Sequence, residues 1–186
     1  MQNIQRYILK LVRVQISFFF IFPAILLINI PLVYSAPPDA DMCAFLERFH
    51  GHTCPGSLMG LRLGLSAKEA LNAQGRIEAK TFLLACPVDG IQVATGATYG
   101  NRAITVDDHK EMYLILTDIE SGKQVEARLT EEAMEKGKGF RELSAKARSL
   151  KEGAAEQSAA KKEVDEILNW YRTAPDEKVV KIKVLK

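Results

Sequence analysis

The first segment of this 186-residue chain differs in composition from everything that follows it, and it limits how much of the chain can form a folded domain. Three basic residues, Arg6, Lys10 and Arg13, precede an apolar run from Ile16 to Tyr34, and the segment contains no acidic residue. A basic start followed by an apolar stretch is typical of a secretory signal peptide. The pattern therefore predicts that the leader makes no contribution to the mature fold.

The end of this segment matches a signal-peptidase site, with the small residue Ser35 two positions after an aliphatic one. The alternative is an uncleaved membrane anchor, because about 20 apolar residues are enough to span a bilayer. Pro23 and Pro31 favour cleavage, since proline breaks a helix shortly before a cleavage site. We therefore expect a signal peptide over 1–35 and an exported domain over 36–186, periplasmic or extracellular, which meets the membrane only through its leader before cleavage.

The charge balance of the mature domain excludes one class of partner. The full chain has 25 basic and 23 acidic residues, a formal net charge of +2, and the three basic residues of the leader account for that excess. A domain close to neutrality lacks the clustered lysine and arginine that hold a nucleic-acid backbone. We expect no nucleic-acid binding.

Apolar periodicity and turn signals predict an α+β domain in which an antiparallel sheet packs against helices. The expected helices are 41–50, 57–73, a short one at 91–94, and an interrupted helical region from Thr130 to Tyr171. The expected strands are 77–84, 103–106, 112–117, 125–129 and 179–184. Gly60 and Gly64 share one side of the second helix at a cost of about 1 kcal/mol each relative to alanine, so a neighbouring backbone is expected against them.

Residues with metal or redox chemistry gather in two short segments. His50, His52 and Cys54 lie in the first segment and Cys86 in the second, which together hold two of the three histidines and two of the three cysteines. Imidazole nitrogen and thiolate sulfur are ligands that zinc, nickel, copper and iron favour, and a turn at Gly51 lets alternate side chains converge. The spacing predicts a transition-metal site.

Cys54 has a further property that supports function without selecting one role. Pro55 and Gly56 are expected to begin a helix, which places the sulfur near free N–H groups at the positive end of the helix dipole and favours the thiolate. A thiolate is both a metal ligand and a redox nucleophile. Three interpretations remain open: a metal site, a reversible disulfide between Cys54 and Cys86, and cysteines that only fill space in the core. A disulfide between Cys54 and Cys86 would leave Cys43 without a partner.

Two separated motifs and the end of the chain resemble the FmdE family of formylmethanofuran dehydrogenase proteins. The resemblance is carried by Phe49–Ser57, Gly60, Arg62, Gly64, Cys86–Asn101 and Trp170–Glu177. It implies an α+β core domain that forms a homodimer, and a metal pocket. Two features depart from the family's pattern: Ala97 stands where many members have a cysteine, and no cysteine follows Cys86, so the core domain alone is expected.

These observations lead to one principal hypothesis, an exported, dimeric FmdE-like protein that binds a transition metal, with zinc as the default ion. The expected metal residues are His52, Cys54 and Cys86 as ligands, His50 as a ligand or a partner of one, Asp89 orienting a ligand through a hydrogen bond, and Thr95 and Asn101 as supporting residues. The alternative is a thiol–disulfide redox protein that uses Cys54 and Cys86. The small-molecule ligand and any catalytic activity stay open, and the family's cytoplasmic formylmethanofuran chemistry is not expected of an exported chain.

Overall fold

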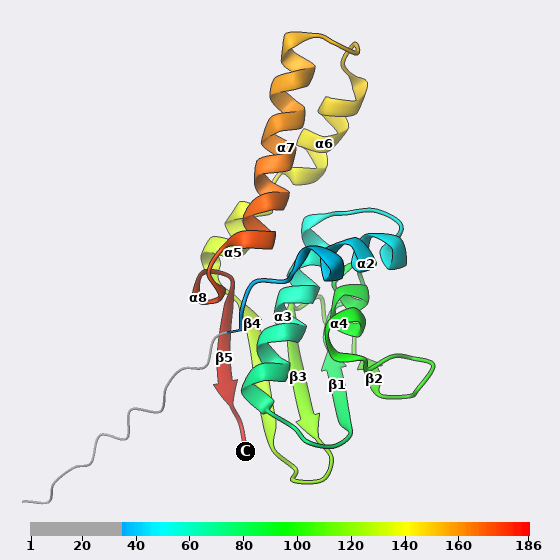
Figure 1. The fold of residues 1–186 in the computed structure, drawn as a ribbon, viewed down its shortest axis with the longest axis vertical. Helices are drawn as coiled ribbons and strands as arrows, with labels where there is room; N and C mark the ends of the chain where they lie inside the picture. Colours follow the sequence, from blue (N-terminus) through cyan, green and yellow to red (C-terminus); the bar gives the residue numbers. More distant parts are fainter. Residues whose placement is uncertain (1–34) are drawn as a thin grey trace, which may run out of the picture. The chain divides into compact units, whose positions relative to one another are not determined.

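The computed structural model describes residues 35–186, so the predicted signal peptide lies outside the described residues except for Ser35. The helices are α2 (Ala40–His50), α3 (Pro55–Leu71), α4 (Pro87–Thr95), α5 (Glu131–Lys136), α6 (Phe140–Ser149), α7 (Ala155–Thr173) and α8 (Asp176–Val179). The strands are β1 (Ile77–Thr81), β2 (Ile104–Val106), β3 (Tyr113–Asp118), β4 (Gln124–Leu129) and β5 (Val180–Val184). The predicted α+β class is confirmed (Figure 1).

The five strands form one sheet in the order β2-β1-β3-β4-β5. The pairs β1–β3, β3–β4 and β4–β5 are antiparallel, as predicted, whereas β1 and β2 run parallel at one edge. The parallel pair arises because α4 connects β1 to β2 and returns the chain to the end of the sheet where β1 began. The expected helix at 91–94 was too short to indicate such a crossover, since α4 begins four residues earlier at Pro87.

Alternating burial along the central strands defines the face of the sheet that carries the core. In β3, Leu114 and Leu116 are fully buried while Ile115 between them is only partly buried, and Val125 and Ala127 alternate with a partly buried residue in the same way in β4. This period of two is the pattern of a sheet covered on one side. Helix α3 packs on this face against β3 and β4, and α4 lies beside α3 (Figure 1).

Three glycines allow α3 and α4 to approach at backbone distance. A Cβ added to Gly60 would lie 2.0 Å from the carbonyl oxygen of Pro87, and one added to Gly90 would lie 2.1 Å from the carbonyl oxygen of Ser57. Gly64 faces the side chain of Ala94 in the same way. The neighbouring backbone expected at Gly60 and Gly64 is therefore α4 of the same chain. These glycines give no support to a dimer, which stays a prediction from the family resemblance.

A buried ion pair joins α3 to the first residue of α8, just beyond the end of α7. Arg62 and Asp176 are 1% and 2% exposed, and Nη2 of the arginine donates to Oδ1 of the aspartate at 3.1 Å. The guanidinium also donates to the backbone carbonyls of Tyr171 and Ala174, and Ser66 donates its hydroxyl to the same carboxylate oxygen. The last carbonyls of α7 thus have a cationic partner, which fixes where this helix ends.

The helical region predicted from Thr130 to Tyr171 divides into α5, α6 and α7. The interruptions fall at the glycines, because Gly139 and Gly153 adopt the left-handed conformation with φ of 73° and 80°. Helices α6 and α7 pack against one another as a pair, and α7 also contacts α3 (Figure 1). Their arrangement matters for function because α6 contributes to the cavity described below.

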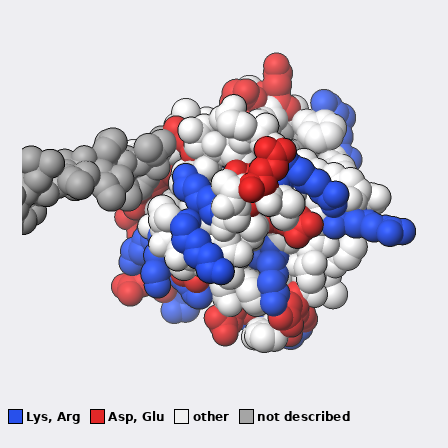
Figure 2. Space-filling view, turned by 90° about the horizontal axis from the view of Figure 1, so that it is seen from below, with Lys and Arg blue, Asp and Glu red and all other residues white. Residues whose placement is uncertain are grey.

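On the face seen in Figure 2, lysine and arginine are interspersed with carboxylates instead of gathering into one patch. The expectation that the chain does not bind nucleic acid stays a prediction.

Among residues 35–186, no helix is both long enough and apolar enough to cross a bilayer.

Replacement of Gly60 by alanine is expected to lower the free energy of unfolding by about 1–3 kcal/mol, because the added methyl group meets the backbone of Pro87. This loss is expected to exceed the gain in helix propensity of about 1 kcal/mol. Urea denaturation measures the difference. The control is Gly100→Ala, whose Cβ would meet only Thr98 Oγ1 at 3.8 Å. Equal loss in the two variants would contradict the close packing of α3 and α4.

Candidate metal centre

Cys54 is positioned by the start of α3. It is the N-cap residue, its sulfur accepts a hydrogen bond from the backbone N–H of Ser57 at 3.4 Å, and its own N–H donates to the hydroxyl of Ser57. Pro55 occupies the first helical position, where a missing N–H costs nothing. A sulfur that accepts an N–H at a helix start is in an environment that stabilises negative charge.

Cys86 occupies the equivalent position before α4 and is also followed by a proline, Pro87. It makes no side-chain capping bond, so its sulfur is not committed to its own helix. A Cβ added to Gly56 would lie 3.0 Å from Cβ of Cys86, which shows how closely the first turn of α3 approaches this residue. The close packing of α3 and α4 therefore brings two Cys-Pro helix starts together.

His50 completes the cluster from the end of α2. Its Nε2 lies 3.8 Å from the sulfur of Cys54, and one donor atom from each of His50, Cys54 and Cys86 lies within 4.8 Å of the others. Gly51, with φ of 86°, ends α2 in the left-handed conformation and turns the chain away toward α3. A His/Cys/Cys group at this separation has the composition and spacing of a transition-metal site.

Asp89 fixes the orientation of His50. Its Oδ2 lies 2.6 Å from Nδ1 of the imidazole, whose side chain is only 10% exposed. Asp89 lies in the first turn of α4, and its other oxygen accepts a hydrogen bond from Gln92. When Nδ1 donates to the carboxylate, Nε2 carries its lone pair toward the two sulfurs, which is the arrangement of a carboxylate–histidine–metal unit.

Burial and the nearby Cys54 sulfur both affect the ionisation of Cys86. Burial raises the pKa of the Cys86 thiol, and the neighbouring Cys54 sulfur raises this pKa further. Two thiolates side by side repel one another, so deprotonation of both requires a compensating positive charge. All three cysteines of the chain are free, and the two in the cluster thus carry no disulfide.

His52 lies outside this group of donor atoms. It is exposed, and its ring lies against that of His50 with 4.6 Å between the centroids. The sequence pattern gave His52 priority as a ligand and left His50 as a ligand or a partner of one, whereas the structure brings His50 to both cysteines. What distinguishes His50 is its contact with Asp89 of α4, which is not visible in the alternating spacing of the two histidines.

Thr95 and Asn101 lie at the opposite end of α4 from Cys86. Thr95 donates its hydroxyl to the carbonyl of Ile91 and accepts the N–H of Ala97. Asn101 donates to the carbonyl of Gly96 and accepts backbone N–H groups on both sides of its own turn. Their hydrogen bonds therefore shape the loop after α4. Of the three residues expected to support the site, Asp89 is the one that contacts the cluster, through its hydrogen bond with His50.

Cys43 also stands apart from the cluster. It is half-buried on α2 and lines a different hollow, together with Arg172. Burial raises the pKa of its thiol. It is therefore a matched comparison for Cys54: a thiol of the same chemistry in the same chain, without a ligand partner.

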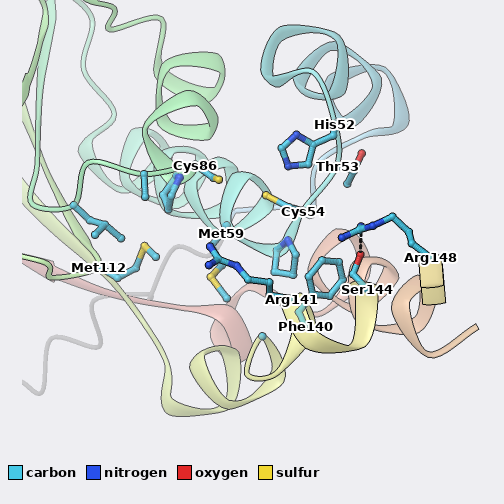
Figure 3. A pocket seen from close by; sticks show the side chains of 16 residues that line it. His52, Thr53, Cys54, Met59, Cys86, Met112, Phe140, Arg141, Ser144 and Arg148 are labelled. Carbon is cyan, nitrogen blue, oxygen red and sulfur yellow. Dashed lines mark hydrogen bonds between the residues drawn. The ribbon is translucent and has the colours of Figure 1, made fainter. Parts of the chain in front are cut away.

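A cavity of about 560 Å³ opens beside Cys54 and Cys86 (Figure 3). His52 also lines it, and its far side is formed by α6 through Phe140, Arg141, Ser144 and Arg148. Nothing in the sequence distinguishes these α6 residues, because their pattern of alternating charges is that of an ordinary solvated helix. Only the folding of α6 against α7 brings them to the cysteines.

Comparison with known proteins agrees with this fold. The sequence profile of the family described as FmdE, Molybdenum formylmethanofuran dehydrogenase operon, matches residues 49–181, which include His50, Cys54 and Cys86. A crystal structure of a tungsten formylmethanofuran dehydrogenase FmdE-like protein from Syntrophus aciditrophicus superposes with a TM-score of 0.53 and 22% identity. The superposition covers 78% of this chain and 71% of that one, and supports the α+β fold.

A curated relative extends the comparison to a longer protein. A "Probable S-adenosyl-L-methionine-binding protein" of Archaeoglobus fulgidus is 29% identical in an alignment of 161 residues, and the match covers 80% of this chain. The match spans 44% of that protein, less than half of its length. The profile match covers most of the present sequence, so the chain belongs to the FmdE family.

Proposed function

We propose that this FmdE-family chain binds one zinc ion per protein through Nε2 of His50 and the sulfurs of Cys54 and Cys86. The observation that carries the proposal is the convergence of these three donor atoms within 4.8 Å, with the other imidazole nitrogen held by Asp89. Two thiolates and one imidazole are a ligand set that zinc accepts in sites with an open fourth position. A bound cation would offset the repulsion between two neighbouring thiolates.

The surroundings favour an open site over a closed structural one. Cys54 and Cys86 both line the cavity beside the cluster, so a fourth ligand would enter from this side. A zinc ion with an exchangeable position polarises a bound oxygen or activates a water molecule. In this chain Asp89 holds the imidazole and the N–H of Ser57 supports the Cys54 sulfur, and the cavity wall would limit what reaches a bound ion. Metal handling and metal-assisted chemistry are both consistent with this arrangement.

We infer in addition that the chain is exported. The support is the basic and apolar composition of residues 1–35 and the small residue at the end of this segment. In the same oxidising compartment, a metal-free pair of Cys54 and Cys86 would be open to disulfide formation. The metal and redox hypotheses therefore concern the same two sulfurs, and a measurement of metal content distinguishes between them.

Substitution of Cys54 by serine is expected to abolish near-stoichiometric zinc binding, since a neutral hydroxyl replaces a thiolate ligand. Cys43→Ser is the matched control and should keep its zinc, because Cys43 lies apart from the cluster. Elemental analysis of protein purified without chelators measures both. Free-thiol counting with and without reductant accompanies it. Equal zinc content in the two variants would contradict the assignment of Cys54 as a zinc ligand. A zinc-free wild type that loses two free thiols on oxidation would support the redox hypothesis in place of the metal one.

The geometry also separates the two histidines of the motif. His50→Ala should lose zinc, whereas His52→Ala should retain it, because only His50 belongs to the group of converging donors. Asp89→Ala removes the partner of the imidazole and should weaken zinc affinity about 10- to 100-fold without abolishing binding. Competition with a fluorescent chelator measures these affinities. A larger loss in His52→Ala than in His50→Ala would reverse the ligand assignment.

Export predicts that the mature chain begins at Ala36. N-terminal sequencing of the protein recovered from the cell envelope measures this directly. The cleavage site depends on the small side chain at Ser35, so replacement of Ser35 by a large residue such as tryptophan should leave the precursor uncut. Recovery of the wild-type protein with its original N-terminus in the membrane would support an anchor instead.

A further inference from the structure

The cavity beside the cluster contains two cationic side chains and no carboxylate among the residues that line it. Arg141, Ser144 and Arg148 follow one another at intervals of three and four residues along α6, which places them on the same face of the helix. Figure 3 shows both arginines extending from α6 toward the part of the cavity where Cys54 and Cys86 lie. The cationic groups thus share one space with the two sulfurs.

The guanidinium groups of Arg141 and Arg148 are free to bind a ligand. Nη1 of Arg148 donates to the hydroxyl of Ser144 at 2.7 Å, a neutral partner that orients the group without neutralising it. Neither arginine forms an ion pair with a carboxylate among residues 35–186, in contrast to Arg128, which pairs with Glu126. A planar guanidinium fork matches the two oxygens of a carboxylate or a phosphate.

Much of the remaining wall of the cavity is apolar, with His52 and Thr53 as polar residues at the turn before Cys54. Met59 and Met112 lie on the side of α3 and the sheet, and Phe140 lies at the start of α6 (Figure 3). Methionine side chains adapt to the shape of an apolar ligand. A volume of about 560 Å³ suits a small molecule, and an apolar lining with a few polar groups is the usual character of a small-molecule site.

We propose that this cavity binds a small organic anion, a carboxylate or a phosphate monoester, with its charged end on Arg141 and Arg148 and its apolar body against Met59, Met112 and Phe140. Because the cavity reaches Cys54 and Cys86, such a ligand approaches the open side of the cluster. Its role as the molecule that meets the zinc ion rests on the proposed function, whereas the binding of the anion depends on the arginines alone.

The test uses three probes of similar size: 3-phenylpropionate, phenyl phosphate and the neutral amide 3-phenylpropionamide. Isothermal titration calorimetry on the zinc-loaded protein should detect at least one of the two anions, and the comparison of carboxylate with phosphate identifies the headgroup. The amide should bind at least about tenfold more weakly, because it lacks the charge that pairs with guanidinium. Failure of both anions to bind, or equal binding of the amide, would overturn the proposal.

Variants on α6 assign the binding to the cavity. Arg141→Gln and Arg148→Gln should each weaken binding of the anion about tenfold. Lys146→Gln is the matched control, because it removes one positive charge from the same helix at a position that does not line the cavity. An equal effect of Lys146→Gln would mean that only the general charge of α6 matters, and this too would overturn the proposal.

Zinc content, measured in the same samples, keeps this inference separate from the proposed function. Arg141→Gln and Arg148→Gln should keep their zinc, while His50→Ala, which removes a proposed ligand that does not line the cavity, should lose zinc and still bind the anion. A zinc-free wild type that binds the anion through the arginines would refute the metal site and support the anion site. A zinc-loaded wild type that binds neither anion would support the metal site and refute the anion site.

Discussion

The candidate metal centre depends on the backbone contact between α3 and α4. At Gly60 and Gly90 the two helices are too close for any side chain, so a larger residue at either position would push the helices apart. Both cysteines of the cluster stand immediately before these helices, so the distance between the sulfurs follows from the distance between the helix axes. Core packing and site geometry are therefore one constraint, since interiors are close-packed and transmit displacement with little relaxation.

The third ligand candidate belongs to a different element and is tied in by its own contact. His50 ends α2, and its imidazole is held by Asp89 from the first turn of α4. This contact serves two purposes: it connects α2 to the α3–α4 pair and selects which imidazole nitrogen faces the sulfurs. The carboxylate that orients His50 is thus supplied by the same helix that Cys86 precedes, and the site is assembled from three helix ends.

Much of the fold and the composition of the site could be predicted from the sequence, because local signals were strong. The pattern of apolar residues predicted the central strands, and the glycine pair predicted a close backbone neighbour. The parallel pairing of β1 and β2 could not be predicted, since it depends on α4 beginning at Pro87. The repeated Cys-Pro dipeptide was the available signal, as proline is favoured at the first helical position.

The choice between the two histidines shows where local pattern stops being informative. His50 and His52 have the same chemistry and flank one glycine, so spacing alone treats them as equivalent. Gly51, in the left-handed conformation, turns the chain after His50. The imidazole of His50 is therefore nearly buried against Asp89, whereas that of His52 is exposed and lies against the His50 ring. The arginines of α6 illustrate the same limit at long range, because their relation to Cys54 exists only after α6 packs against α7. Tertiary contact, which no short window of sequence encodes, therefore determines which imidazole joins the sulfurs and which charges surround them.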